Sequence, residues 1–196
     1  MKATGVDVLI SAPQKGWSSS PSAGLVTLSE RAMAALEGTK SSSFSVDLGK
    51  WHQIMQAYEN GGHAYHATMP TDGLTRFHTV MMETADYGFD KVKAEQQELG
   101  DKVRSLLAER GFKSVAAPGF EAPGVVVCYT DDADVQNGKK FAANGMQIAA
   151  GVPLQCEEPV GFSTFRLGLF GLDKLHNVDR TVAQLATALD AVAGTE

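Results

Sequence analysis

The sequence predicts a mixed α/β fold, and three observations carry that prediction. Two apolar runs near the N-terminus, residues 6–12 and 24–29, have the composition of strands. Long segments with helical periodicity follow, and short apolar runs then alternate with helical segments toward the C-terminus. Such alternation is typical of α/β chains. The hydrophobic share of 43% and the charged share of 20% are those of an ordinary globular protein.

The first sixty residues predict two buried, adjacent strands of a parallel sheet and two helices. Ser29 is placed to cap a helix over residues 30–37, which Gly38 ends. Asp47 is placed to cap a second helix that runs to about Tyr58. Two adjacent buried strands need further strands beside them, so this part is not expected to fold easily alone.

The remaining residues predict long helices packed on a small antiparallel sheet. Helical periodicity predicts four helices, over residues 71–87, 89–110, 133–144 and 178–192. Apolar runs predict four short strands, over residues 112–116, 124–130, 147–150 and 164–169. A composition shift at Asn60-Gly61-Gly62 predicts a hinge, and we therefore expect two domains, residues 1–60 and 61–196.

Composition and charge exclude several classes of function. A net charge of −6 gives no electrostatic basis for binding nucleic acid or an anionic membrane. No apolar run approaches the roughly 18 residues of a membrane-spanning helix. With only Cys128 and Cys156, the chain predicts no disulfide framework and a cytoplasmic location. His63 and His66 lack a further ligand pair, so no metal site is predicted.

Lys15 stands where a lysine is unusual, just after the predicted strand 6–12 and Pro13. An ammonium is costly to remove from water without a partner. Such a lysine either reaches back to solvent or serves as a reactive amine, usually by forming a Schiff base. The position alone leaves both readings open.

The residues around Lys15 resemble a known lysine motif. Residues 7–17 (Asp-Val-Leu-Ile-Ser-Ala-Pro-Gln-Lys-Gly-Trp) and 21–29 are similar to the lysine segment of the class V aminotransferases. These enzymes use pyridoxal 5'-phosphate (PLP), and the alanine–glyoxylate and serine–glyoxylate aminotransferases are the most similar group. The resemblance implies that Lys15 forms the Schiff base with PLP and that Gln14 contacts its phosphate.

Arg166 carries the second resemblance. The residues alone leave two readings for an arginine in an otherwise apolar strand: a buried arginine–carboxylate pair or a bound carboxylate. Residues 165–171 (Phe-Arg-Leu-Gly-Leu-Phe-Gly) resemble the Arg-Ile-Gly strand of the same family. That resemblance implies that Arg166 binds the α-carboxylate of the substrate through a two-pronged contact.

Tyr65 and Thr68 carry the third resemblance. Taken alone, residues 65–70 (Tyr-His-Ala-Thr-Met-Pro) predict a loop before a helix that begins at Pro70. They are also similar to the Tyr-His-x-Thr-x-Pro motif of the family. The resemblance implies that Tyr65 and Thr68 reach the phosphate of a partner's PLP across the interface of a homodimer.

The resemblance covers essentially the whole chain but only part of the family's length. Family chains are about twice as long and carry the lysine near their middle. The chain therefore resembles a C-terminal half: the end of the large PLP-binding domain, followed by the small α+β domain. The family's aspartate for the pyridine nitrogen, its stacked aromatic ring and its glycine-rich helix start all precede the lysine by more residues than this chain supplies.

The implied function is a transaminase that moves an amino group from a small amino acid, alanine or serine, to a 2-oxo acid such as glyoxylate or pyruvate. We expect this fragment to be inactive by itself. One alternative is a non-catalytic, truncated domain that dimerises. A weaker alternative is a cysteine desulfurase or another PLP-dependent lyase that uses Cys156, although the adjacent Glu157 and Glu158 disfavour a thiolate.

Overall fold

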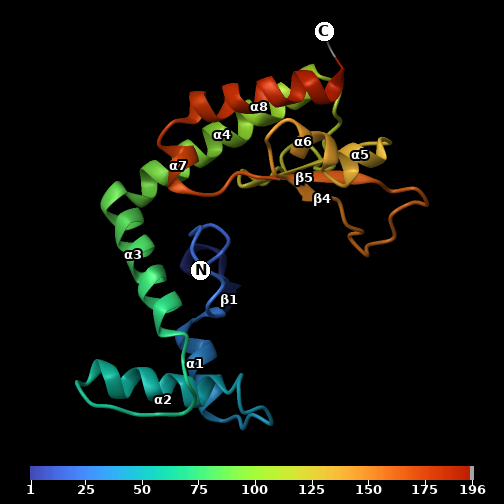
Figure 1. Cartoon of the computed structure of the whole chain (residues 1–196). Helices are drawn as coiled ribbons and strands as arrows, with labels where there is room; N and C mark the ends of the chain where they lie inside the picture. The colour runs from blue at the N-terminus through green and yellow to red at the C-terminus, as the bar shows by residue number, and fades with distance from the viewer. Residues whose placement is uncertain (195–196) are drawn as a thin grey trace. The chain divides into compact units, whose positions relative to one another are not determined.

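The computed structural model describes residues 1–194, which form two compact units. We call residues 1–15 and 19–80 the N-terminal unit, and residues 16–18 and 81 onward the C-terminal unit. Each unit is a group of mutually packed residues. The boundary between them along the chain falls within helix α3, Thr71–Tyr87. The division into domains 1–60 and 61–196 stays a prediction. The mixed α/β class is confirmed (Figure 1).

A two-stranded hairpin opens the N-terminal unit, after the short 3-10 helix η1 (Lys2–Thr4). Strands β1 (Val8–Ser11) and β2 (Leu25–Leu28) pair antiparallel, with Val8 opposite Leu28. The expectation of a parallel arrangement is therefore wrong for this pair. Parallel neighbours need a crossover, usually a helix, and residues 12–24 contain no helix.

Strand β1 is exposed along its length and β2 is half-buried at its ends, so neither strand is buried, which corrects a second expectation. Val8 is 49% exposed, Leu9 50% and Ile10 73%, so both faces of β1 meet solvent. The continuous apolar run is typical of a strand covered on both faces. None of the residues that the structure describes supplies such a cover.

The helices of the N-terminal unit begin where the sequence predicts. Helix α1 (Glu30–Glu37) is capped by the Ser29 hydroxyl, which accepts from the Ala32 N–H, and ends at Gly38. Helix α2 (Leu48–Glu59) is capped by the Asp47 carboxylate, which accepts from the Lys50 N–H. These side chains satisfy backbone donors that a helix start leaves without partners.

The C-terminal unit is built on an antiparallel sheet, as the sequence predicts, and its strand order is β3-β5-β4. Strand β5 (Thr164–Gly168) lies between β3 (Val125–Tyr129) and the very short β4 (Ala149–Ala150). Alternate side chains of β5 point to opposite faces. Phe165 and Leu167 enter the core, and Arg166 lies on the other face.

Two long helices cover the core face of this sheet. Helices α4 (Phe89–Glu109) and α8 (Val178–Ala193) lie side by side and run in the same direction (Figure 1). Lys102 pairs with Asp179, and Arg110 pairs with Asp190, at 2.6 Å each. The hydrophobic core between helices and sheet contains Leu99, Val103, Leu107, Val126, Cys128, Phe141, Phe165, Leu167, Leu185 and Leu189.

Two expected elements differ in detail, and one further element was not expected. The predicted strand over residues 112–116 is only a single bridge from Ser114 to Cys128. The predicted helix 133–144 is two short helices, α5 (Ala133–Gln136) and α6 (Lys139–Ala143), because Gly138 takes a left-handed conformation between them. Helix α7 (Leu172–Leu175), a single turn after β5, was not predicted. No helix within residues 1–194 is both long enough and apolar enough to cross a membrane.

Candidate functional site

Lys15 and Gln14 lie on a turn that leaves β1. The Lys15 N–H donates to the Ala12 carbonyl at 3.3 Å, and the Ser19 N–H donates to the Pro13 carbonyl at 2.9 Å. These bonds close the turn around Pro13, whose side chain is fully buried. Both Gln14 and Lys15 are exposed. No carboxylate in the part of the chain that the structure describes forms a salt bridge with the Lys15 ammonium.

Tyr65 and Thr68 lie close together at the end of the loop before α3. The Tyr65 hydroxyl lies 3.2 Å from the Thr68 Oγ1, and both residues are exposed. Two neighbouring hydroxyls from one loop present donors that can bind two oxygens of the same phosphate group. The pair therefore has suitable geometry for an anion.

His66 is a positioning residue that the sequence argument missed. Its Nε2 lies 2.9 Å from the Phe44 carbonyl oxygen, and its ring packs on Phe44 and Trp51. These contacts hold the segment between Tyr65 and Thr68 against the start of α2. The only signal in the sequence was the histidine of the Tyr-His-x-Thr motif itself, because its partners are distant in the chain.

Arg166 occupies the middle of the central strand β5. It pairs across the ladder with Val127 on one side and Ala149 on the other. Its Nε donates to the Ala150 carbonyl at 2.8 Å, which fixes the direction of the side chain. Within residues 1–194 no carboxylate pairs with the guanidinium, so the buried arginine–carboxylate pair is not formed there. Its two terminal nitrogens are left for a planar, two-pronged contact.

The loop after β4 approaches the strand of Arg166 very closely. A Cβ on Gly151 would lie 1.7 Å from the Thr164 carbonyl oxygen, so only glycine fits. The Gln136 amide also donates to the Gly151 carbonyl at 3.0 Å. This packing holds the start of the segment 151–154.

Cys156 lies further along this loop and is exposed. The N–H groups of Gln155 and Cys156 both donate to the Glu158 carboxylate, at 2.8 Å each. These bonds hold the pKa of Glu158 below its usual range, with the Gln155 N–H as the largest cause. A carboxylate held so close to the cysteine gives no support to a nucleophilic thiolate.

Cys128 is a core residue. It lies in β3 at 2% exposure, and burial raises the pKa of its thiol to about 11. It is therefore a neutral thiol that packs as a small apolar group.

The candidate residues divide between the two units. Lys15, Gln14, Tyr65 and Thr68 belong to the N-terminal unit, and Arg166 belongs to the C-terminal unit. Only Tyr65 and Thr68 are brought together by a direct side-chain contact. Their assignment as site residues stays a prediction.

No protein-family model matches the chain. Solved structures do share its fold. Alanine–glyoxylate aminotransferase from Nostoc sp. is 22% identical, with a TM-score of 0.78 over 97% of this chain and 49% of that chain. Aspartate aminotransferase from Thermus thermophilus is 23% identical, with a TM-score of 0.74 over 97% and 51%. Ureidoglycine–glyoxylate aminotransferase from Bacillus subtilis is 17% identical, with a TM-score of 0.74 over 95% and 46%.

The chain thus spans about half the length of the solved structures that it matches. That share is consistent with the C-terminal half that the three motifs predict. The chain has the fold of the class V aminotransferases over this part of their length.

Proposed function

We propose that the chain supplies part of the site of a PLP-dependent transaminase, one that moves an amino group from a small amino acid to a 2-oxo acid. The observation that carries the proposal is the exposed amine of Lys15, which has no carboxylate partner within residues 1–194, on a turn whose sequence matches the lysine motif. The fold shared with solved aminotransferases supports it.

The residues present suit PLP in three respects. Lys15 offers an amine for the aldehyde carbon of the cofactor. Tyr65 and Thr68 offer two hydroxyl donors 3.2 Å apart for its phosphate, and Gln14 a further amide donor. Arg166 offers the free ends of its guanidinium for the carboxylate of an amino acid.

PLP, when bound, supplies an electron sink that stabilises negative charge at the substrate Cα. Lys15 would then have two tasks: its Nζ would hold PLP, and the same amine, when free, would carry a proton to or from the substrate Cα. Arg166 orients the substrate by fixing its carboxylate, because the Ala150 carbonyl holds its Nε in one direction. We further propose that Tyr65 and Thr68 act on the partner's phosphate in a homodimer and that the chain alone has little activity.

Mass spectrometry after borohydride reduction tests the role of Lys15. The 196-residue chain is incubated with PLP, reduced and digested, and the modified peptide is located. We expect modification at Lys15 that disappears in Lys15→Ala and persists in Lys40→Ala, an exposed loop lysine used as the matched control. Equal labelling of Lys15 and Lys40 would overturn the proposal.

A second function, a non-catalytic dimerising module, is favoured by one observation. The N-terminal unit exposes apolar side chains on both faces of β1 and around an apolar groove of about 810 Å³ between β2 and α2. Sedimentation equilibrium with and without PLP separates the two candidates. A stable dimer whose Lys15 is never selectively labelled would support the module.

A further inference from the structure

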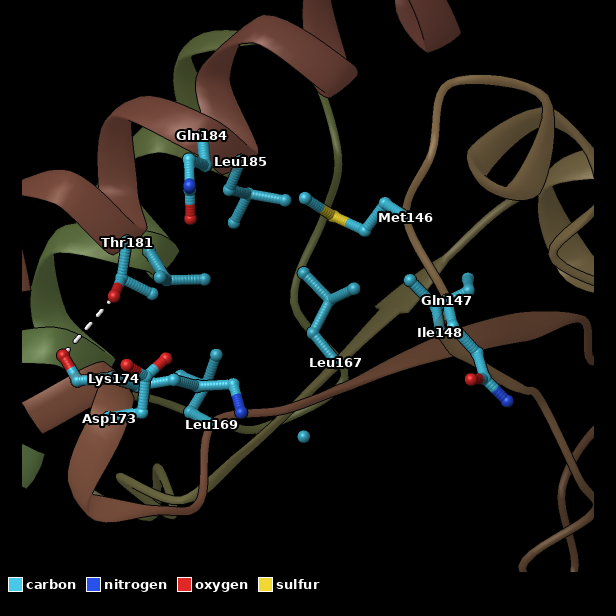
Figure 2. Close-up of a pocket in the computed structure, with 12 residues that line it drawn as sticks. Met146, Gln147, Ile148, Leu167, Leu169, Asp173, Lys174, Thr181, Gln184 and Leu185 are labelled. Carbon is cyan, nitrogen blue, oxygen red and sulfur yellow. Dashed lines mark hydrogen bonds between the residues drawn. The ribbon is translucent and has the colours of Figure 1, made fainter.

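A small apolar cavity lies inside the C-terminal unit, between the end of β5 and the helices (Figure 2). Its volume is about 190 Å³. Side chains from α4, α8, β5 and the segment before β4 form its apolar wall: Val103, Met146, Ile148, Leu167, Leu169 and Leu185. Met146 and Leu185 point toward one another across the space, with Leu167 below them.

The rim of this cavity carries a lysine ammonium whose hydrogen-bond donors are only partly satisfied. Lys174, on α7, donates one hydrogen bond from its Nζ to the Phe170 carbonyl at 2.8 Å. An ammonium has three donors, so two remain. Among residues 1–194 no carboxylate forms a salt bridge with Lys174.

The neighbouring acid does not neutralise Lys174, because it has another partner. The Asp173 carboxylate pairs with the Arg180 guanidinium at 3.0 Å. Thr181 is likewise occupied, since its hydroxyl donates to the carbonyls of Lys174 and Asn177 (Figure 2). The exposed Gln184 amide completes the polar side of the rim. Asp173, Lys174 and Arg180 together leave one positive charge at the mouth.

We propose that this cavity binds a small carboxylate with a ring-sized apolar body, which enters between Met146, Leu167 and Leu185 while the carboxylate meets Lys174. An engineered apolar cavity of about 150 Å³ in another protein holds benzene, so this volume accepts one such ring. The flexible thioether of Met146 adapts its wall to the shape of the occupant.

This occupant is a different molecule from the substrate proposed above. Leu167 and Leu169 face the helices, whereas Arg166 lies on the opposite face of the strand and does not line the cavity. The binding is therefore testable without PLP and without transaminase activity.

Isothermal titration calorimetry on the 196-residue chain tests the proposal with three probes of one ring size: phenylacetate, benzylamine and toluene. We expect phenylacetate to bind most tightly, because only it combines the ring with a carboxylate. In Lys174→Met the affinity for phenylacetate should fall roughly tenfold, since one charge-assisted hydrogen bond is lost, while the affinity for toluene should not.

A cavity-filling variant locates the site. Met146→Trp should abolish the binding of phenylacetate, because the indole occupies the apolar space, whereas Met82→Trp, at an exposed position on α3, should leave it unchanged. Circular dichroism verifies that each variant is folded. Absence of phenylacetate binding to the parent chain, or equal affinity for phenylacetate and benzylamine, would overturn the proposal, as would retained binding in a folded Met146→Trp chain.

Discussion

Asp7 connects the hairpin of the N-terminal unit to the start of α1. Its carboxylate accepts from the Ser29 hydroxyl at 2.6 Å and from the Arg31 guanidinium, and its carbonyl accepts from the Ser29 N–H at 2.9 Å. Ser29 therefore caps the helix while it is itself held by Asp7. The Arg31 contact is the largest cause that lowers the pKa of Asp7, and Ser29 adds to it.

This lowered pKa predicts acid-sensitive stability. A carboxyl whose pKa is lower in the folded chain stabilises the fold above its ordinary value of 3.8, and that contribution is lost as the pH falls through the lowered pKa. We expect Asp7→Asn to reduce the urea midpoint at pH 7, and the gap from the parent chain to close below about pH 3.8. The fluorescence of Trp51, recorded in a Trp17→Phe background, measures both urea midpoints.

Asp86→Asn is the matched control, because Asp86 is exposed on α3 and forms no salt bridge within residues 1–194. The urea midpoint of Asp86→Asn should equal that of the parent chain at pH 7 and at pH 3. A gap for Asp7→Asn that is constant from pH 7 to pH 3 would contradict the linkage to ionisation.

Individual residues differ in how far their roles could be predicted. The caps at Ser29 and Asp47 were predictable because the side-chain oxygen bonds to an N–H three residues away. The support that His66 gives to Tyr65 and Thr68 was not, since Phe44 and Trp51 meet it only after the chain has folded back. The orientation of the Arg166 guanidinium could not be predicted either. It depends on the bond from its Nε to the Ala150 carbonyl, and the register of β4 against β5 places that carbonyl.

At the scale of the elements, close packing limits how large a side chain can be where a helix contacts a loop. Gly100 lies in the middle of α4, where glycine normally weakens a helix. Here a Cβ would meet the backbone of Pro123, 2.8 Å from its carbonyl oxygen and 2.9 Å from its Cα. The same carbonyl accepts from the Gln96 amide at 3.0 Å, so the loop has little room to retreat.

Two glycine-to-alanine changes should therefore have opposite signs. Gly100→Ala should reduce the free energy of unfolding by about 1–3 kcal/mol, the usual cost of overpacking. Gly49→Ala, in α2, should raise it by about 0.5 kcal/mol, because its Cβ would have a nearest neighbour at 3.4 Å and helix propensity then dominates. Urea denaturation of both variants measures these values. A stabilised Gly100→Ala chain would show that the loop at Pro123 yields.

Elements with strong periodicity were predicted well, and those defined by tertiary contacts were not. The bounds of α1 and α3 match the predicted ranges, because caps and apolar spacing are local signals. The break between α5 and α6 depends on the φ of 83° at Gly138, which periodicity does not report. The antiparallel pairing of β1 with β2 was missed because an apolar run does not specify the direction of its neighbour.

At the scale of the whole molecule, apolar burial is unevenly distributed. The C-terminal unit contains a continuous core from Leu99 to Val192, with both long helices and the sheet contributing. The N-terminal unit leaves large apolar side chains exposed, among them Val8, Ile10, Phe44, Val46 and Met55. Exposed apolar surface marks an interaction site or a tendency to associate where it is contiguous.

A charge on the hairpin tests whether this surface is free in solution. Ile10 is 73% exposed, so Ile10→Lys should change the free energy of unfolding by less than about 0.5 kcal/mol. The same change should lower self-association, seen as a smaller weight-average mass in analytical ultracentrifugation. As a buried comparison, Leu99→Ala should cost about 2–5 kcal/mol. A loss of similar size for Ile10→Lys would mean that another chain covers Ile10.

The central position of β5 fixes its register, whereas the loop between β4 and β5 is free to change in sequence and length. Its peptide groups bond to a neighbour on each side, so its register shifts only if two ladders break together. A shift of one residue would turn Arg166 into the core and Leu167 out of it. Insertions in the loop between β4 and β5 do not change that register. Descendants of this sequence can therefore diversify that loop while the guanidinium of Arg166 keeps its position on the sheet.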